Sequence, residues 1–518
     1  MNGAQALITT LVDNGVRVCF ANPGTSEMHF VAALDTVPRM RGVLTLFEGV
    51  ATGAADGYAR MSGDPAAVLL HLGPGLGNGL ANLHNARRAR VPMLVVIGDH
   101  ATYHKRYDAP LESDIDSVAK TVSGWVRRTG TPGDIGMDAV EALAFARAGH
   151  HISTLILPAD VSWSEGAEAT EMVALQEYSD VADTESVEGA LRSGDSTVIL
   201  IGGDATRGPG LRAAARLAEK FGARLFCETF PTRLERGAGV PAVERIAYLG
   251  EAAAAQLDGT RQLILAGAAS PVTFFAYPGK PSDLVPDGCA VHRLAGPVGA
   301  AAALTGLADR LAPDAAAPIA PPARPVLPSG PLNVQTAAEV VGAMLPERAI
   351  VVDESNTSGF VLPQATAGAP VHDWLTLTGG AIGYALPVAI GAAIAAPDRP
   401  VLCLESDGSA MYTISALWTH AHEELDITTV VFANRAYDIL RIELQRVGAQ
   451  PDIRGTGPRA EALLDLSHPT MDFVKMAESM GVPARRAATA EEFADALRWS
   501  FGEPGPHLIE AVMPSIGG

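Results

Sequence analysis

Short apolar runs rich in β-branched residues alternate along this chain with longer segments of helical periodicity. In the first third, four such runs predict buried strands at residues 16–24, 65–73, 91–99 and 153–160. The same pattern returns at residues 196–205, 223–230 and 261–268, and again at residues 349–355, 400–406, 428–434 and 507–513. Strands separated by helical segments are typical of parallel sheets covered by helices on both faces. The pattern therefore predicts an α/β protein with doubly wound parallel sheets.

Two changes in composition divide the chain. Residues 312–331 place prolines among alanines with almost no charge, as in a stiff extended connector. Residues 163–188 are acidic and lack periodicity between two patterned regions. We therefore predict three domains, at residues 1–165, 180–315 and 333–518.

The composition argues against several classes of protein. The chain has 518 residues, and 38 Lys and Arg against 58 Asp and Glu give a net charge of −20. So acidic a chain repels nucleic-acid phosphates and anionic membranes, so neither is expected as a partner. The four cysteines are far apart, which argues against a disulfide framework and against a paired-cysteine metal site.

Neither the N-terminus nor the most apolar stretch predicts membrane targeting. The first residues lack the basic segment and the uniform apolar run of a signal peptide, so we expect a cytoplasmic protein. Residues 379–396 are uncharged, but they contain four glycines and Pro387. A buried helix entered through a glycine turn is therefore expected there instead of a membrane span.

The most specific chemical signal lies at two strand ends in the last third of the chain. Asp407 closes one predicted strand, Gly408 and Ser409 lead into a helix, and Asn434 closes the next strand. Ligands of parallel sheets bind at the carboxyl ends of the strands. Oxygen side chains there can share a Mg²⁺ ion, and the start of a helix favours a diphosphate. Taken alone, Asp-Gly-Ser also fits an ordinary strand-to-helix turn.

This segment resembles the metal and diphosphate motif of the thiamine diphosphate enzymes of the acetolactate synthase and benzoylformate decarboxylase group. The resemblance covers nearly the whole chain and implies a pyrimidine-binding, a middle and a diphosphate-binding domain. It also implies that Asp407 and Asn434 bind Mg²⁺ by side chain and Ala436 by its backbone carbonyl. Ser406 and Ala433 depart from the family motif, at positions that do not usually bind the metal.

Two further segments resemble this family at its cofactor. Residues 379–393 are similar to its cofactor-packing helix, which implies that Gly380 and Ile382 contact the pyrimidine. Residues 353–359 are similar to its diphosphate-side loop. The resemblance therefore also implies that the cofactor is bound by Gly408, Ser409, Asn356 and Thr357. By their composition alone, the two segments also fit an apolar helix and a Ser/Asn turn.

Glu48 is the strongest candidate for catalysis. It stands between an apolar strand and a helix of small residues, where an unpaired carboxylate is costly. A favourable charge at the start of a helix is the simpler interpretation. The resemblance implies instead that Glu48 hydrogen-bonds a ring nitrogen of the aminopyrimidine and thereby activates the cofactor.

Two loops of the first third resemble those at the reacting end of the cofactor. The resemblance places Pro23 and Thr25 near that end, Asn78 on the cofactor and His71 beside the substrate. His71 matches the proton-transfer histidine of benzoylformate decarboxylase, where acetolactate synthases usually carry a small hydroxyl residue.

One position departs from benzoylformate decarboxylase. Ala276 stands where that enzyme has its second histidine, which argues against a simple aryl-glyoxylate decarboxylase. His100 and His104 lie on a loop after a strand and could supply a proton relay, but a solvated loop is the favoured interpretation.

The resemblance implies decarboxylation of a small 2-oxo acid, with thiamine diphosphate and Mg²⁺, followed by aldehyde release or carboligation to a second carbonyl. A true acetolactate synthase acting on two pyruvates is the alternative. Active sites at the subunit interface of a homodimer or homotetramer are implied as well. Acetolactate synthases often hold FAD in the middle domain, but no motif of this chain requires it.

Two remote alternative functions belong to other classes of protein. Glycines between residues 73 and 79, with Asp99 ending the next strand, imitate part of the dinucleotide-binding pattern of an NAD-dependent oxidoreductase. The third glycine of that pattern is missing in every alignment of the pattern with this segment. A non-catalytic cofactor-binding subunit is the other alternative, and the presence of Glu48 argues against it.

Overall fold

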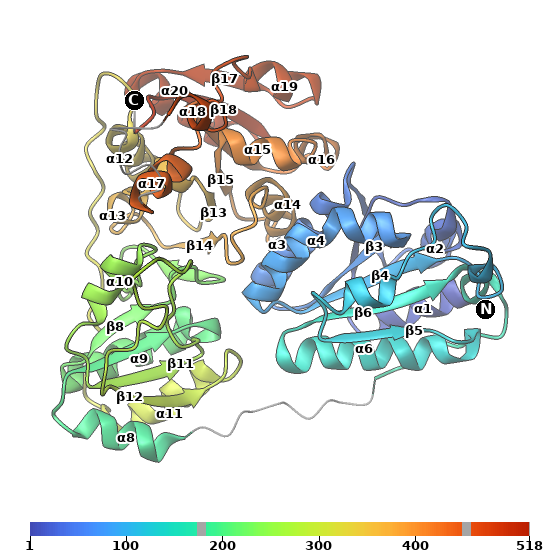
Figure 1. Ribbon diagram of the computed structural model, residues 1–518, viewed down its shortest axis with the longest axis horizontal. Coiled ribbons are helices and arrows are strands. Elements are labelled where there is room, and N and C mark those ends of the chain that lie inside the picture. The colour runs from blue at the N-terminus through green and yellow to red at the C-terminus, as the bar shows by residue number, and fades with distance from the viewer. Residues whose placement is uncertain (173–182, 448–456, 517–518) are drawn as a thin grey trace.

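The computed structural model describes residues 1–172, 183–447 and 457–516. Three sheets form, each built mainly from a different third of the chain (Figure 1). All eleven predicted runs form strands. Residue 180, the predicted start of the middle domain, lies outside the described residues.

The first sheet has six parallel strands in the order β2-β1-β3-β4-β6-β5. Its strands are β1 (Val18–Ala21), β2 (Arg41–Leu44), β3 (Ala66–His71), β4 (Met93–Asp99), β5 (Trp125–Arg128) and β6 (Ile152–Pro158). The helices around it are α1 (Gly3–Asp13), α2 (Met28–Thr36), α3 (Glu48–Ser62), α4 (Leu72–Ala89), α5 (Ile115–Ala119), α6 (Ile135–Gly149) and α7 (Ala159–Trp163). Strand β5 lies at an edge and carries two arginines, so it lacks the apolar run of the central strands.

The second sheet has five parallel strands in the order β10-β8-β7-β11-β12. Its strands are β7 (Thr197–Ile201), β8 (Arg224–Cys227), β10 (Glu244–Arg245), β11 (Gln262–Ala266) and β12 (Ala290–Ala295). Its helices are α8 (Thr184–Arg192), α9 (Gly208–Phe221), α10 (Gly250–Leu257) and α11 (Ala300–Leu311).

The third sheet has seven strands in the order β17-β18-β16-β15-β13-β14-β9. Its strands are β13 (Ile350–Glu354), β14 (His372–Thr376), β15 (Val401–Ser406), β16 (Ile427–Ala433), β17 (Ala484–Ala487), β18 (His507–Val512) and the antiparallel β9 (Leu234–Arg236). Its helices are α12 (Val334–Met344), α13 (Leu362–Ala365), α14 (Ala385–Ala395), α15 (Asp407–Thr413), α16 (Ala416–His422), α17 (Asp438–Arg446), α18 (Pro458–Glu461), α19 (Phe473–Ser479) and α20 (Ala490–Gly502). Because β9 belongs to the middle of the sequence, that region contributes an edge to this sheet.

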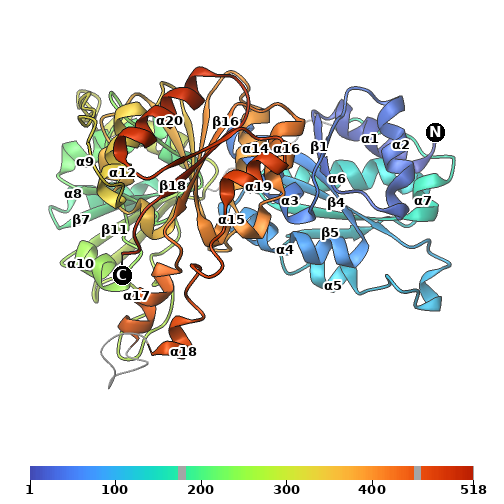
Figure 2. The same cartoon turned by 90° about the horizontal axis from the view of Figure 1, so that it is seen from above.

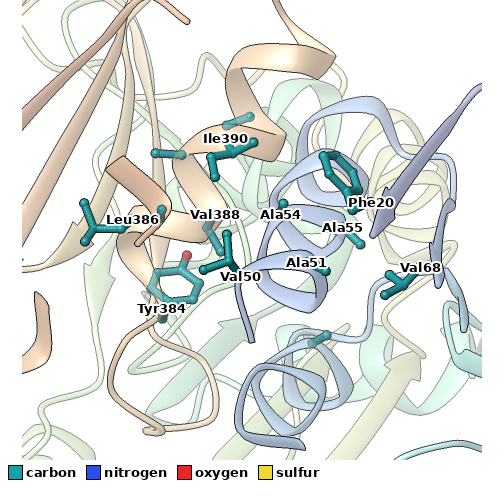
Figure 3. Packing of buried hydrophobic residues seen from close by; sticks show 14 of the residues in the cluster. Phe20, Val50, Ala51, Ala54, Ala55, Val68, Tyr384, Leu386, Val388 and Ile390 are labelled. Atoms are coloured by element: carbon teal, nitrogen blue, oxygen red, sulfur yellow. The ribbon is translucent and has the colours of Figure 1, made fainter. Parts of the chain in front are cut away.

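Helices α3 and α14 join the first and third sheets (Figures 2 and 3). One buried apolar cluster continues from Phe20 through Ala54 of α3 to Val388 of α14. A Cβ atom on Gly57 would lie 2.0 Å from the backbone oxygen of Val388, and one on Gly391 would lie 1.8 Å from that of Ala54. Glycine at these two positions therefore permits the close approach of the helices.

The apolar stretch 379–396 forms a turn followed by α14, which has 11 residues. Among the described residues, no helix combines the length and the apolar character that a membrane crossing requires. Each of the four cysteines is free, as the sequence predicts.

Candidate cofactor site

Asp407 is the first residue of α15 and follows β15 directly. Its side chain is buried, and its two oxygens accept hydrogen bonds from the backbone N–H of Gly408 at 2.8 Å and of Arg435 at 2.6 Å. Burial raises the pKa of this carboxyl to about 6, although the two N–H groups act in the opposite direction. In the described part of the chain, no lysine or arginine forms an ion pair with Asp407.

Asn434 follows β16, the strand next to β15. Its Oδ1 accepts a hydrogen bond of 3.1 Å from the N–H of Ala436, and its Nδ2 donates one of 3.0 Å to Asp438. The N–H of Arg435 connects this loop to Asp407. A buried carboxylate, an amide oxygen and nearby peptide carbonyls are hard oxygen donors, so this donor set fits a divalent cation such as Mg²⁺.

The predicted diphosphate-side residues lie beside Asp407. Asn356 donates hydrogen bonds to the hydroxyls of Ser406 at 2.8 Å and of Ser409 at 3.2 Å. Thr357 follows Asn356 in the 3₁₀ helix η5 (Asn356–Gly359) and is buried. At Gly408, a Cβ atom would lie 2.4 Å from the Tyr437 ring, so the turn needs a glycine.

A buried glutamate that the sequence analysis did not select holds the predicted pyrimidine segment. The carboxylate of Glu354 accepts hydrogen bonds of 2.7–2.8 Å from the N–H groups of Gly383, Tyr384 and Ala385. Burial raises its pKa to about 7, and burial likewise raises the pKa of Glu405, its partner in register on β15. Glu354 could have been found as a carboxylate that ends an apolar strand.

The turn before α14 lies between the first and third sheets. Its carbonyls accept hydrogen bonds from three side chains of α4: His84 to Gly379 at 3.1 Å, Asn85 to Ala381 at 2.8 Å and Asn82 to Gly383 at 3.2 Å.

Gly380 and Ile382, the two residues predicted to contact the pyrimidine, belong to this same turn. Gly380 has a φ of +75°, which favours glycine, and Ile382 packs against the apolar cluster. A Cβ atom on Gly380 would lie 2.7 Å from the Phe274 ring of the middle region.

Glu48 and Asn78, which follow strands of the first sheet, come together. Glu48 is the first residue of α3 and is 7% exposed. Asn78 of α4 donates a hydrogen bond of 3.0 Å to its Oε2. The structure thus places two of the predicted residues in contact and gives the carboxylate one fixed partner.

His71 ends β3 and is held by a second buried carboxylate. Its Nδ1 lies 2.8 Å from Oε2 of Glu27 and 3.2 Å from the hydroxyl of Ser26. A Cβ atom on Gly24 would lie 2.2 Å from the His71 ring, so only glycine allows this approach. The contact leaves Nε2 as the ring nitrogen that faces away from Glu27.

Glu27 and Ser26 were missed by the sequence analysis, although both lie in the loop that it selected. Within the 3₁₀ helix η1 (Thr25–Glu27), Thr25 is exposed while Glu27 is buried. Pro23 is half-buried just before this helix. The position of Glu27, two residues after Thr25, does not by itself show that its side chain is buried, so the sequence offered no local signal for it.

The glycine-rich segment after β3 forms the first turns of α4 and not a free phosphate loop. Asp99, the candidate ribose acid, pairs with Lys105 at 3.1 Å and with Arg128, and it accepts a hydrogen bond from the N–H of His100. The structure therefore uses Asp99 in a local ion network. The rings of His100 and His104 contact each other at 5.3 Å between centroids.

A cavity of about 530 Å³ lies at the ends of β7, β8 and β11 of the middle sheet. Asp204 lines it and accepts hydrogen bonds of 2.8 Å from the N–H groups of Gly299 and Ala301. These amides open α11, so the carboxylate of Asp204 satisfies the start of that helix.

Comparisons with known proteins show the family to which the chain belongs. Residues 1–119 match the N-terminal TPP binding domain of thiamine pyrophosphate enzymes, and residues 359–511 match their C-terminal TPP binding domain. The chain is 73% identical, over all 518 residues of both chains, to the "Putative acetolactate synthase large subunit IlvX" of Mycobacterium tuberculosis. It is 30% identical, over 97% of each chain, to benzoylformate decarboxylase of Pseudomonas aeruginosa.

The fold is shared with solved structures. The thiamine diphosphate-dependent 4-hydroxybenzoylformate decarboxylase of Rhodococcus jostii RHA1 superposes with a TM-score of 0.86 over 100% of both chains, at 24% identity. At that identity the similarity shows the fold alone. Together with the sequence matches, it establishes that this chain belongs to the thiamine pyrophosphate enzymes of the acetolactate synthase and benzoylformate decarboxylase family.

Proposed function

We propose that this protein decarboxylates a small 2-oxo acid with thiamine diphosphate and Mg²⁺, and then releases an aldehyde or joins the product to a second carbonyl. The observation that carries the proposal is the His71–Glu27 contact of 2.8 Å. A histidine held through one ring nitrogen by a buried carboxylate is suited to proton transfer at its other nitrogen.

The proposed cation site depends on the oxygen donors that follow β15 and β16. Asp407, Asn434 and the carbonyl of Ala436 would hold Mg²⁺. The cofactor's diphosphate would then bind this ion and the side chains or backbone of Asn356, Thr357, Gly408 and Ser409. Asp407 supports this assignment, because its carboxylate is buried and no cationic side chain of residues 1–172, 183–447 or 457–516 forms an ion pair with it.

Glu48 would act at the other end of the cofactor. Bound thiamine diphosphate supplies a carbon nucleophile and an electron sink for the pair of electrons left by CO₂. Glu48 would hold a proton at the pyrimidine ring nitrogen, and Asn78 would orient the Glu48 carboxylate. Gly380 and Ile382 would position the pyrimidine from the turn before α14.

His71 would move a proton at its Nε2, while Glu27 fixes the ring. Pro23 and Thr25 would line the reacting end beside it. Because Glu27 is buried and also accepts the N–H of Gly24 at 2.9 Å, the orientation of His71 is set before any substrate binds.

We also propose that two copies of the chain share each site. Apolar side chains are exposed near both halves: Leu46 beside Glu48, and Met411 and Tyr412 in α15. Such side chains are suited to an interface that closes over the cofactor. A homodimer would be the minimal active unit, and two dimers would form a tetramer.

The test is product analysis with purified protein. The protein is stripped with EDTA, supplied with thiamine diphosphate and Mg²⁺, and given a panel of 2-oxo acids with and without acceptor aldehydes. We expect CO₂ release that depends on both additions. Absence of CO₂ from the whole panel, with cofactor bound, would favour the non-catalytic subunit.

Acetolactate synthesis is the second candidate, favoured by the name of the relative that is 73% identical. With pyruvate as the only substrate, such an enzyme forms acetolactate, whereas a decarboxylase forms acetaldehyde. His71 favours the decarboxylase, because acetolactate synthases usually carry a small hydroxyl residue at that position.

A further inference from the structure

Asp438, the first residue of α17, is a buried carboxylate with four hydrogen-bond donors. Its side chain is 1% exposed. One oxygen accepts from Nδ2 of Asn434 at 3.0 Å and from the N–H of Ile516 at 2.8 Å. The other accepts from the hydroxyl of Ser515 at 2.5 Å and from Arg441 at 3.2 Å. Asp438 thus contacts the loop of the cation site and the C-terminal segment together.

The contact with Asn434 decides which way that amide points. An asparagine side chain has a donor end and an acceptor end, and a carboxylate can accept only from the donor end. With Nδ2 bound to Asp438, Oδ1 must face the other side, where it accepts from the N–H of Ala436. Rotation of the amide by 180° would set Oδ1 against the carboxylate and leave a buried group unsatisfied.

The C-terminal segment reaches Asp438 along the third sheet. Strand β18 pairs in parallel with β16, and Ala433, the last residue of β16, is the partner of Val512. The N–H of Met513 then donates to the carbonyl of Ala433, directly before Asn434. Residues 513–516 therefore leave the sheet at the same strand end as the cation site.

The carboxylates around Asp438 outnumber the cations that pair with them, unlike the charges of a simple surface ion pair. Arg441 contacts both Asp438 and Glu461, so one cation faces two carboxylates. Asp407 joins this group through the loop, because the N–H of Arg435, next to Asn434, donates to its carboxylate at 2.6 Å. The cluster of Asp407, Asp438, Glu461 and Arg441 is therefore left with an excess of negative charge beside the oxygens of Asn434, as a divalent cation requires.

We propose that Asp438 is a positioning residue that fixes the Asn434 amide for the cation and couples the C-terminal segment 513–516 to cation and cofactor binding. The inference rests on the proposed function, since it needs the cation at Asp407 and Asn434. Coupling between two sites is reciprocal: if the segment strengthens cation binding, cation binding must order the segment by the same factor.

The first experiment measures Mn²⁺ affinity, by electron paramagnetic resonance of free Mn²⁺, for protein mixed with thiamine diphosphate. Asp438→Asn keeps the shape of the side chain but removes its charge and two of its acceptor positions. We expect the Mn²⁺ affinity to fall about 10- to 100-fold, the range for partners of metal ligands. Asp183→Asn, at the N-cap of α8 in the middle region, is the matched control and is expected to leave the affinity unchanged.

The second experiment measures both the effect of the C-terminal segment on Mn²⁺ binding and the effect of Mn²⁺ binding on that segment. Ser515→Ala and a chain ending at Met513 are each expected to weaken Mn²⁺ binding about 3- to 10-fold. In the wild-type protein, Mn²⁺ with thiamine diphosphate is expected to slow hydrogen exchange in the peptide that contains Ile516. That protection is expected to disappear in Asp438→Asn.

The outcomes separate the two proposals. If the wild-type protein takes up no Mn²⁺ in the presence of thiamine diphosphate, the proposed function fails. If it binds Mn²⁺ and Asp438→Asn binds equally well, with unchanged exchange near Ile516, the proposed function stands and the role of Asp438 is overturned. If circular dichroism shows that Asp438→Asn does not fold, Ser515→Ala and the shortened chain decide the question by the same measurements.

Discussion

Asn78 donates a hydrogen bond of 3.0 Å to the carboxylate of Glu48, and the two residues lie on the helices that follow β3 and β2. The contact fixes a carboxylate that is 7% exposed at the start of α3. A buried acid with one neutral donor keeps an oxygen available for a ligand, in contrast to Asp56, which pairs with Arg60 in the same helix.

We expect Glu48→Gln to lower the rate of CO₂ release about 10²- to 10⁴-fold, the contribution typical of a proton-transfer group. Gln keeps the size of the side chain, so quenching of protein fluorescence by thiamine diphosphate should give nearly the same affinity. Glu141→Gln, an exposed change on α6, is the control. Full activity of Glu48→Gln would remove Glu48 from the catalytic assignment.

Glu27→Gln should lower kcat about 10- to 100-fold with little change in KM, because His71 loses its charged acceptor but the substrate pocket keeps its shape. The pH profile of kcat is the decisive measurement, since the loss of a partner of the proton-transfer group should change it, whereas the loss of a structural contact should not. Ser26→Ala, which removes the hydrogen bond of the hydroxyl to Glu27 and its contact of 3.2 Å with His71, should have a smaller effect. An unaltered pH profile in Glu27→Gln would argue that the pair is only structural.

Two buried histidines should oppose folding as the pH decreases from 7 to 5. Burial lowers the pKa of His372 and of His420 to about 4, so between pH 6.5 and 4 the unfolded state binds protons that the folded state does not. Each histidine then costs about 2 kcal/mol of unfolding free energy at pH 5. Glu354, Glu405 and Asp407 act in the opposite direction, because burial raises the pKa of each carboxyl and the folded state takes up a proton first.

The variant that isolates this effect is His420→Gln. Gln can still donate to the carbonyl of Leu386, which His420 contacts at 3.0 Å, but it does not titrate. Urea unfolding followed by circular dichroism at pH 7 and pH 5 gives the change in unfolding free energy between the two pH values. In His420→Gln this change should be more favourable to the folded state by about 2 kcal/mol than in the wild-type protein. Equal changes in both proteins would contradict the assignment of His420.

Gly57→Ala should destabilise the contact of α3 with α14. The added methyl group would meet the backbone oxygen of Val388, which cannot move independently, and overpacking of this kind costs about 1–3 kcal/mol. Gly189→Ala in α8 has no atom within 4 Å and should stabilise its helix by about 0.5–1 kcal/mol. Thermal unfolding of the two variants should therefore shift in opposite directions.

Local patterns in the sequence were enough to find the central strands and several site residues. Strand β15 and the turn at Gly408 are contiguous in the chain, and the contacts of Asp407 with Gly408 depend on neighbours only. Glu27 could not be recognised in this way, because its role comes from His71, 44 residues later. Asp438 depends likewise on Ser515 and Ile516, 77 and 78 residues away.

The sequence by itself determined the α/β class, eleven of the strands and several residues at their ends, because apolar periodicity and turn chemistry act over a few residues. Only the tertiary structure decided which strand ends meet, how β9 joins the third sheet and which buried carboxylates face His71 and Asn434. Those contacts join distant segments, and their energies depend on burial and on hydrogen-bond geometry that exist only after the sheets and helices have packed.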